Sequence, residues 1–254
     1  MIFKDFFQRW SKQRERSKLS KSIRTISNKH TLAENRLAAM DRLKSIGSEE
    51  ALCGLLARYN FIITDKSIQD LEEKERVESI LIEFGERAVP ALKRFIESST
   101  SIAWPVRILK KLISEDSLIH FLLGRVSTEE IVFNERLLDK NVELLNHLAE
   151  YNHIAIVKKA TELLTPDNDD RIRFQAIAII EKAGDENARN SLLKLATDPS
   201  ETARIKNRIF EAFAHQRWSV HGYRGKIEEL LPSEYSITRE GMIKSKNDYG
   251  PKES

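Results

Sequence analysis

Apolar residues recur along most of the chain at the three- and four-residue spacing that marks one face of a helix. The stretch 77–96 shows this spacing twice, with a short break between the two series: Ile80, Leu81 and Phe84, then Val89, Leu92, Phe95 and Ile96. No convincing series of alternating apolar and polar residues occurs before residue 232. The pattern therefore predicts an all-α fold over most of the chain.

One phrase recurs: a helix, a short break that is glycine in four of its six copies, and a second helix rich in Ala and Leu. Its clearest copies are 37–56, 77–96 and 174–193, and weaker copies are 105–123, 138–164 and 205–231. The breaks lie at Gly47, Gly85, Glu115, Asn152, Gly184 and Gly222. The first and last are 175 residues apart over five intervals, a mean spacing of 35 residues. A period of this length is typical of helical repeat proteins.

The composition of the breaks has a physical reason. Glycine readily adopts the left-handed conformation that ends a helix, and Gly47 and Gly184 stand where the first helix of a copy should stop. Acidic residues follow at Glu49 and Asp185, where negative charge is favoured by the positive end of the next helix. The glycines and the acidic residues after them therefore both predict that one helix ends and the next begins at these positions.

Each predicted helix pair has an apolar face that it cannot cover alone, and stacking neighbouring pairs would bury these faces in one continuous core. We therefore expect an α-solenoid of about six helical hairpins, an armadillo-type fold. The expected organisation is a basic amphipathic arm at 1–30, the solenoid at 31–231, and a C-terminal hairpin with a disordered tail at 232–254.

Three of the phrases resemble the repeats of bacterial HEAT-repeat proteins, including the short HEAT-like repeats first associated with phycobilin lyases. The resemblance rests on IGSEEAL at 46–52, FGERAVPAL at 84–92 and AGDENA at 183–188. The stretch WSVHGYR at 218–224 is also similar to the ends of such proteins. The resemblance covers roughly 31–231 and implies a helical solenoid with a scaffold role. The Trp, Gly, Tyr and Ala pattern of tetratricopeptide repeats is missing.

Composition fits this interpretation, because charged residues make up 32% of the chain and only nine Gly and six Pro are present. The single cysteine, Cys53, excludes an internal disulfide and suits a buried core position in a reducing compartment. No apolar run is long enough for a membrane span, and no secretory signal is visible. The expected location is therefore cytoplasmic.

Signatures of catalysis are missing from the sequence. The six histidines lack the spacing of a metal site, and no phosphate-binding glycine loop or nucleophile motif is present. The carboxylates at 70–75 alternate with basic residues, as expected of a solvated helix face. We therefore expect no enzymatic activity, no cofactor and no bound metal.

The first thirty residues differ from the rest of the chain. They carry nine Lys or Arg against Asp5 and Glu15, a net charge of +7, which leaves −4 for residues 31–254. Four aromatic residues there follow the spacing of one helix face: Phe3, Phe6, Phe7 and Trp10. This stripe is expected to do one of three things: cap the first repeat, dock a protein partner, or contact a membrane surface.

A second set of candidate binding residues lies on the predicted second helices of the pairs. These basic residues are Arg58, Arg94, Arg125, Lys159 and Lys194. The second helices of a HEAT array line its concave face, so the set could form a ladder for an acidic peptide or phosphates. The alternative is ordinary solvation, since Glu97 and Glu162 dilute the charge.

The end of the chain changes pattern. Tyr235 and Ile237 alternate with polar residues, and Gly241 can turn the chain before Ile243, which predicts a short hairpin. Trp104 and Trp218 are expected to be packing residues at helix ends.

The leading functional hypothesis is a non-catalytic HEAT-repeat scaffold or adaptor that binds protein partners. One alternative is an enzyme on a HEAT-like scaffold, similar to a DNA glycosylase or a bilin lyase, although the acidic body argues against nucleic acid as a partner. The other alternative is a peripheral membrane adaptor that uses the N-terminal helix.

Overall fold

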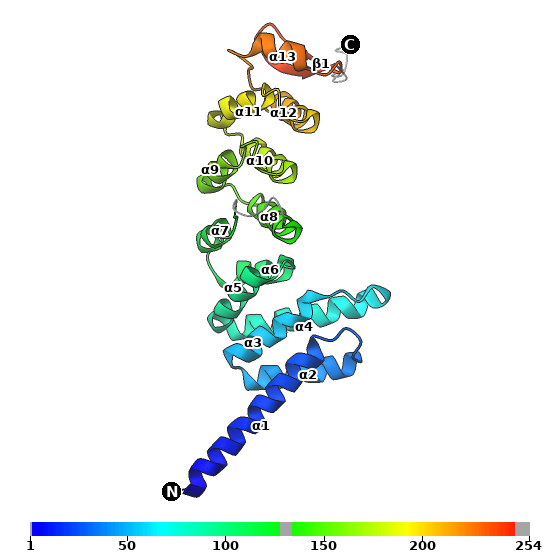
Figure 1. Cartoon of the computed structure of the whole chain (residues 1–254), viewed down its shortest axis with the longest axis vertical. Helices are drawn as coiled ribbons and strands as arrows, with labels where there is room; N and C mark the ends of the chain where they lie inside the picture. Colours follow the sequence, from blue (N-terminus) through cyan, green and yellow to red (C-terminus); the bar gives the residue numbers. More distant parts are fainter. Residues whose placement is uncertain (1, 128–133, 247–254) are drawn as a thin grey trace, which may run out of the picture. The chain divides into compact units, whose positions relative to one another are not determined.

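The computed structural model describes residues 2–127 and 134–246, with side chains from residue 13 onward. The described chain is mostly helical and includes one small two-stranded sheet (Figure 1), which confirms the predicted all-α class and the C-terminal hairpin. The chain divides into two compact units, Met1–Leu118 and Ile119–Ser254.

The first unit consists of helices and short 3₁₀ turns. Its helices are α1 (Ile2–Ile26), α2 (Ala33–Ile46), α3 (Glu49–Leu56), α4 (Ser67–Phe84), α5 (Val89–Ser98) and α6 (Ala103–Leu112), and α7 (Glu115–Leu123) begins in it. The 3₁₀ turns are Ala57–Asn60, Thr64–Lys66 and Gly85–Ala88. Helix α1 packs on α2 and α3, while α2 lies against α4 and α3 against α5. Helix α4 in turn contacts α6, so helices of successive pairs cover one another.

The second unit repeats this arrangement. It contains α8 (Glu135–Leu148), α9 (Ile154–Glu162), α10 (Asp170–Ala183), a 3₁₀ turn (Glu186–Ala188), α11 (Arg189–Ala196), α12 (Ala203–Gln216), α13 (Arg224–Leu230), β1 (Tyr235–Ile237) and β2 (Ile243–Ser245). Helix α10 packs against α8 on one side and α12 on the other, and also against α9. Within this unit, α8, α10 and α12 form one row and α9 and α11 a second (Figure 1).

The predicted breaks separate successive helices. Gly47 and Gly184 take left-handed φ values of 58° and 65° at the C-terminal ends of α2 and α10. The side chain of Ser48 then accepts a hydrogen bond from Ala51 N and caps α3, and Asp185 caps the following turn in the same way. Each of the six predicted copies is found as two successive helices, from α2 and α3 to α12 and α13.

The two tryptophans that were expected to be packing residues are buried to different extents. Trp218 is buried against Phe213, with ring centroids 5.5 Å apart. Trp104 is half-buried and stacks on Tyr59 at 5.7 Å. Both therefore contribute to packing, as expected.

The C-terminal hairpin pairs Tyr235 with Ser245 and Ile237 with Ile243 in antiparallel register. Gly241 in its turn has a φ of 81°, the conformation that favours glycine. Lys246 N donates a hydrogen bond to Glu234 O at 2.7 Å. Residues 247–254 of the predicted tail lie outside the described residues.

Gly54 lets α1 approach α3 closely. A Cβ atom built at this position would lie 2.5 Å from Ile23 Cγ1 of α1, closer than real Cβ contacts. Any larger side chain would therefore push the two helices apart.

We expect Gly54→Ala to destabilise the protein by about 1–2 kcal/mol, because the overlap outweighs the better helix propensity of alanine. The matched control is Gly225→Ala in α13, where nothing lies within 4 Å of the added methyl group. The control should be neutral or stabilising, by up to about 1 kcal/mol. Urea unfolding followed by circular dichroism measures both, and equal effects at the two sites would contradict the close-packing argument.

Candidate functional site

Charged side chains are buried together in the first unit. Arg58 is fully buried (0% exposed), and its guanidinium lies between two carboxylates of α4. Its Nε atom donates to Glu73 Oε2 at 2.6 Å, and its Nη2 atom donates to Asp70 Oδ1 at 2.6 Å. Arg36 of α2 binds Glu73 from the other side through two hydrogen bonds of 2.8 and 2.7 Å. Lys74 Nζ completes the cluster at 2.7 Å from Asp70 Oδ2.

This ion cluster, formed by Arg36, Arg58, Asp70, Glu73 and Lys74, holds two loops in place. The loop before α2 is bound through Arg36 Nη1, which donates to the carbonyl oxygens of Lys29 and Thr31. The loop before α4 is bound through Arg58 Nη1, which donates to Phe61 O at 3.1 Å. In addition, Ile63 N donates to Asp70 Oδ1 at 2.9 Å. The cluster therefore fixes both loops from beneath.

Hydrogen bonding decides the ionisation of the two acids. Burial alone would raise the pKa of Glu73, but hydrogen bonds from Arg36 and Arg58 outweigh it and hold the pKa below its ordinary value. Burial likewise acts to raise the pKa of Asp70, and hydrogen bonds from Arg58, Lys74 and Ile63 N lower it overall. Both carboxylates therefore stay charged at neutral pH.

We expect Glu73→Gln to destabilise the protein by about 3–5 kcal/mol, because it leaves two buried guanidinium groups without their shared counter-charge. Glu83→Gln is the matched control, because Glu83 forms an exposed ion pair with Lys44 at 2.6 Å. Removal of that pair should cost less than about 1 kcal/mol. Urea unfolding separates the two variants, and a small effect at Glu73 would contradict the role of the cluster.

The lowered pKa values also predict acid sensitivity. A carboxylate whose pKa is lower in the folded state contributes stability above its unfolded pKa, and that contribution is lost as the pH falls through the folded pKa. The free energy of unfolding should therefore fall between about pH 5 and about pH 3, the range around and below the ordinary Asp and Glu values. In Glu73→Gln this fall should be smaller. Urea titrations at several pH values test this, and an equal fall in both proteins would exclude Glu73 as its source.

The two loops enclose a cleft of about 400 Å³, here named the Leu32–Ile62 cleft. Its walls are residues 29–33 and 62–66, with Arg36 and Gln69. Leu32 and Ile62 lie on opposite loops and are 70% and 68% exposed. Ile68, which precedes Gln69 at the start of α4, is 74% exposed. Large apolar side chains exposed around one cleft are typical of a binding surface.

The charge of the cleft wall is mainly positive. Its charged residues are Lys29 and Lys66 against a single acid, Asp65, apart from the neutralised Arg36. Neither Lys29 nor Lys66 forms an ion pair with any residue that the structure describes. The buried guanidinium of Arg36 is neutralised by Glu73. The cleft therefore combines apolar edges with unpaired positive charge.

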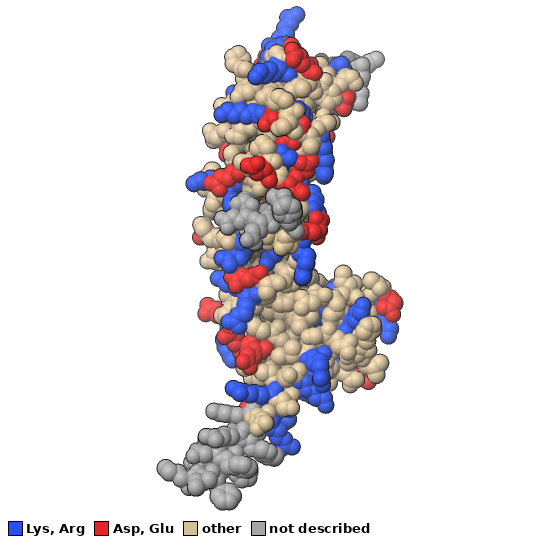
Figure 2. Space-filling model, viewed as in Figure 1, with Lys and Arg blue, Asp and Glu red and all other residues tan. Residues whose placement is uncertain are grey.

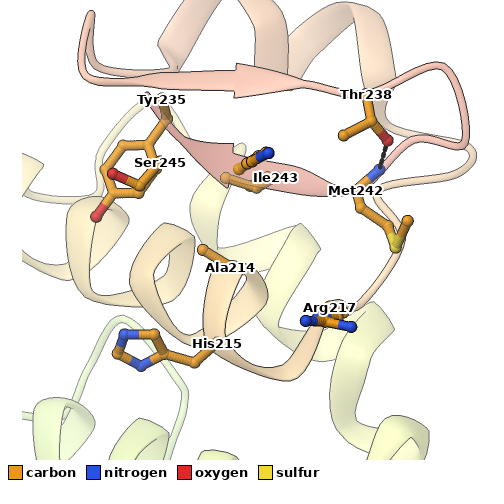
Figure 3. Close-up of a pocket in the computed structure, with 9 residues that line it drawn as sticks. Ala214, His215, Arg217, Tyr235, Thr238, Met242, Ile243 and Ser245 are labelled. Carbon is orange, nitrogen blue, oxygen red and sulfur yellow. Dashed lines mark hydrogen bonds between the residues drawn. The ribbon is translucent and has the colours of Figure 1, made fainter. Parts of the chain in front are cut away.

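A second cleft, of about 620 Å³, lies in the second unit between the end of α12 and the hairpin (Figure 3). Arg217 lines it in a left-handed conformation with a φ of 55°, alone among the described residues other than glycine. Hydroxyl groups of Tyr235 and Ser245 face it from the strands. His215 on its edge is bound by Glu181, with 2.8 Å between Nδ1 and Oε1. Its lining combines these polar groups with the apolar side chains of Ala214, Met242 and Ile243.

The structure places the five residues of the predicted basic ladder in different environments. Arg58 belongs to the buried ion cluster, so it has no surface to offer a ligand. Arg94 is exposed, and its Nη2 atom binds Glu49 at 2.6 Å. In the second unit, Arg125 is exposed and lies over the ring of Phe121, Lys159 is half-buried, and Lys194 is exposed.

The remaining sequence candidates are only partly described. Phe3, Phe6, Phe7 and Trp10 belong to α1, but they lie outside the residues whose side chains the structure describes. Cys53 is half-buried, not fully buried as a core position would be. Burial raises the pKa of its thiol, and the nearby Arg94 acts against this shift.

The described residues also bear on metal chemistry and membrane insertion. Among them, no group of three or more His, Cys, Asp or Glu side chains is placed to hold a metal ion. None of the described helices is both long and apolar enough to cross a membrane. Comparison with protein-family models and with curated proteins finds no match to this chain.

Sequence reasoning missed the ion cluster and the Leu32–Ile62 cleft. The alternation of charges at 70–75 predicts a solvated helix face, and this is wrong for Asp70, Glu73 and Lys74, which are buried. The spacing of 70, 73 and 74 along one helix face was the available signal. For the cleft, the signal was an apolar residue, Leu32, directly before a predicted helix, where a capping residue is expected.

Proposed function

We propose that this chain is a non-catalytic protein-binding scaffold and that the Leu32–Ile62 cleft is its docking site. The observation that carries the proposal is Leu32. It occupies the N-cap position of α2, makes no capping hydrogen bond there, and is largely exposed. Ser, Asp or Asn at an N-cap stabilises a helix by about 1 kcal/mol relative to an apolar residue. Helix stability therefore does not explain this leucine, whereas contact with a partner does.

The fold that we propose for this scaffold is a HEAT-type α-solenoid. Support comes from the helix pairs, whose members contact the next pair within each unit, as α10 does with α8 and α12. Buried ion pairs that link one helix pair to the next also occur in both units. Arg36 and Arg173 each follow the first residue of a helix by three positions, and each binds a buried glutamate from further along the chain, Glu73 and Glu201. Such recurrence is expected of repeated units.

The partner segment that fits the cleft carries apolar anchors next to Asp or Glu. Leu32 and Ile62 are 70% and 68% exposed, so covering each of them would contribute about 1–2 kcal/mol. Unpaired Lys29 and Lys66 favour an acidic segment and disfavour a basic one. Because the ion cluster fixes both loops beforehand, little conformational entropy is lost on binding.

We propose no enzymatic activity, and an enzyme of the glycosylase or bilin lyase type is the weaker alternative because no observation in either cleft favours it. A cytoplasmic location fits a chain with one cysteine. The interaction would be reversible, since a cleft of this size engages a short segment of a partner.

Selection of short random peptides by phage display on the full chain tests the docking site. We expect enrichment of peptides that combine Leu, Ile or Phe with Asp or Glu. Affinity for these peptides should fall by at least about 10-fold in the double variant Leu32→Asp/Ile62→Asp, because two apolar contacts are lost and negative charge is added. Fluorescence polarisation with labelled peptides measures the change.

The matched control is Ile154→Asp, which changes a residue of α9 that is 74% exposed in the second unit. It should leave peptide affinity unchanged. The double variant should remain folded, because Asp is a favoured N-cap residue at position 32 and Ile62 lies on the surface. Peptides that bind wild type and double variant equally, or an enriched set without acidic residues, would contradict the proposal.

A further inference from the structure

Helix α1 packs on the first unit with only one of its faces. Among its described side chains, the buried or half-buried ones are Leu19, Ser22, Ile23, Thr25 and Ile26, and all but Thr25 follow the spacing of one helix face. Ile26 and Ser22 are almost completely buried, and Ile23 meets α3 at Gly54. These contacts fix the helix to α2 and α3. The opposite face is consequently held away from the body of the unit.

The opposite face of the described part of α1 is basic. Arg14, Lys18, Lys21 and Arg24 are all exposed and follow one another at intervals of four, three and three residues. They form a stripe about 15 Å long, at 1.5 Å of rise per residue. Across residues 13–26 five Lys or Arg face one acid, Glu15, which gives a net charge of +4. Figure 2 shows this concentration of Lys and Arg along the described part of α1.

Three residues of the stripe differ in their pairing from some other exposed basic residues of the protein. Arg76 binds Asp41 at 2.8 Å, and Arg224 binds Glu228 at the same distance. Among the described residues, Lys18, Lys21 and Arg24 form no ion pair. Like charges along one helix face repel each other, and an anionic partner would relieve the repulsion among Lys18, Lys21 and Arg24.

We propose that this basic face of α1 binds the surface of anionic lipid bilayers. A straight, protruding stripe fits a flat array of negative headgroups, and each Lys or Arg close to such a surface adds favourable energy. The sequence also places Phe7 and Trp10 seven and four residues before Arg14, a spacing that repeats one helix face. Aromatic residues favour the membrane interface, and stable binding needs an apolar signal beside a basic one.

This inference does not depend on the docking site. The stripe shares no residue with the Leu32–Ile62 cleft, and the peptide assay contains no lipid. Failure of one proposal therefore leaves the other standing.

Co-sedimentation of the full chain with vesicles tests the inference. We expect binding to phosphatidylcholine vesicles that contain about one-third phosphatidylserine, and much weaker binding to pure phosphatidylcholine. Raising the salt from about 0.05 M to about 0.5 M should weaken binding, because ions screen the headgroup charge. The variant Arg14→Gln/Lys18→Gln/Lys21→Gln/Arg24→Gln should reduce the partition coefficient by at least about 10-fold.

The matched control removes the same number of positive charges from exposed lysines of the second unit. Its substitutions are Lys158→Gln, Lys194→Gln, Lys226→Gln and Lys244→Gln. Control binding should stay within about two-fold of wild type if the stripe makes the contact. Circular dichroism checks that both variants remain helical.

Three results would overturn the proposal. One is the absence of co-sedimentation with the anionic vesicles. Another is an equal loss of binding in the control, which would mean that total charge matters and the α1 stripe does not. The third is stripe-dependent binding of duplex RNA or polyglutamate by a chain that ignores the vesicles, which would assign the stripe to a different class of macromolecule.

Discussion

A helix with one apolar face is stable in water only when another element covers that face, and this constraint organises both units. Helix α10 shows it most directly, since it lies between α8 and α12 and also contacts α9. In the first unit, α2 and α3 are covered by α1 on one side and by α4 and α5 on the other. Each added helix buries one more apolar face, so stability increases with every repeated unit.

The ion cluster follows a different logic, because buried charges are costly unless they are paired and fully hydrogen-bonded. Glu73 satisfies this condition by lying between Arg36 and Arg58, and Asp70 does so by binding Arg58 and Lys74. The ion cluster contributes more to the position of the surrounding loops than to the stability of the protein. Hydrogen bonds from the two arginines reach the carbonyl oxygens of both surrounding loops, so a cluster inside the unit determines the shape of a cleft on its surface.

The first unit therefore offers two surfaces that its own packing does not explain. Leu32 and Ile62 expose apolar area where a polar residue would be more favourable for the free chain. Along α1, Arg14, Lys21 and Arg24 concentrate positive charge on an exposed helix face. One surface suits an apolar and acidic segment, and the other suits an extended negative surface. A scaffold that joins a protein partner to a membrane would use both.

Local sequence determined the features that depend on neighbouring residues. Gly47 and Gly184 end helices because of their backbone freedom, and the spacing of apolar residues located all six helix pairs. Gly241 similarly marked the turn of the hairpin. Arg58 shows where such reasoning stops. Its partners Asp70 and Glu73 lie 12 and 15 residues away, and Arg36 reaches Glu73 across 37 residues. Only the packed structure brings these charges together, because burial and ion pairing depend on distances that the spacing of residues along the chain does not contain.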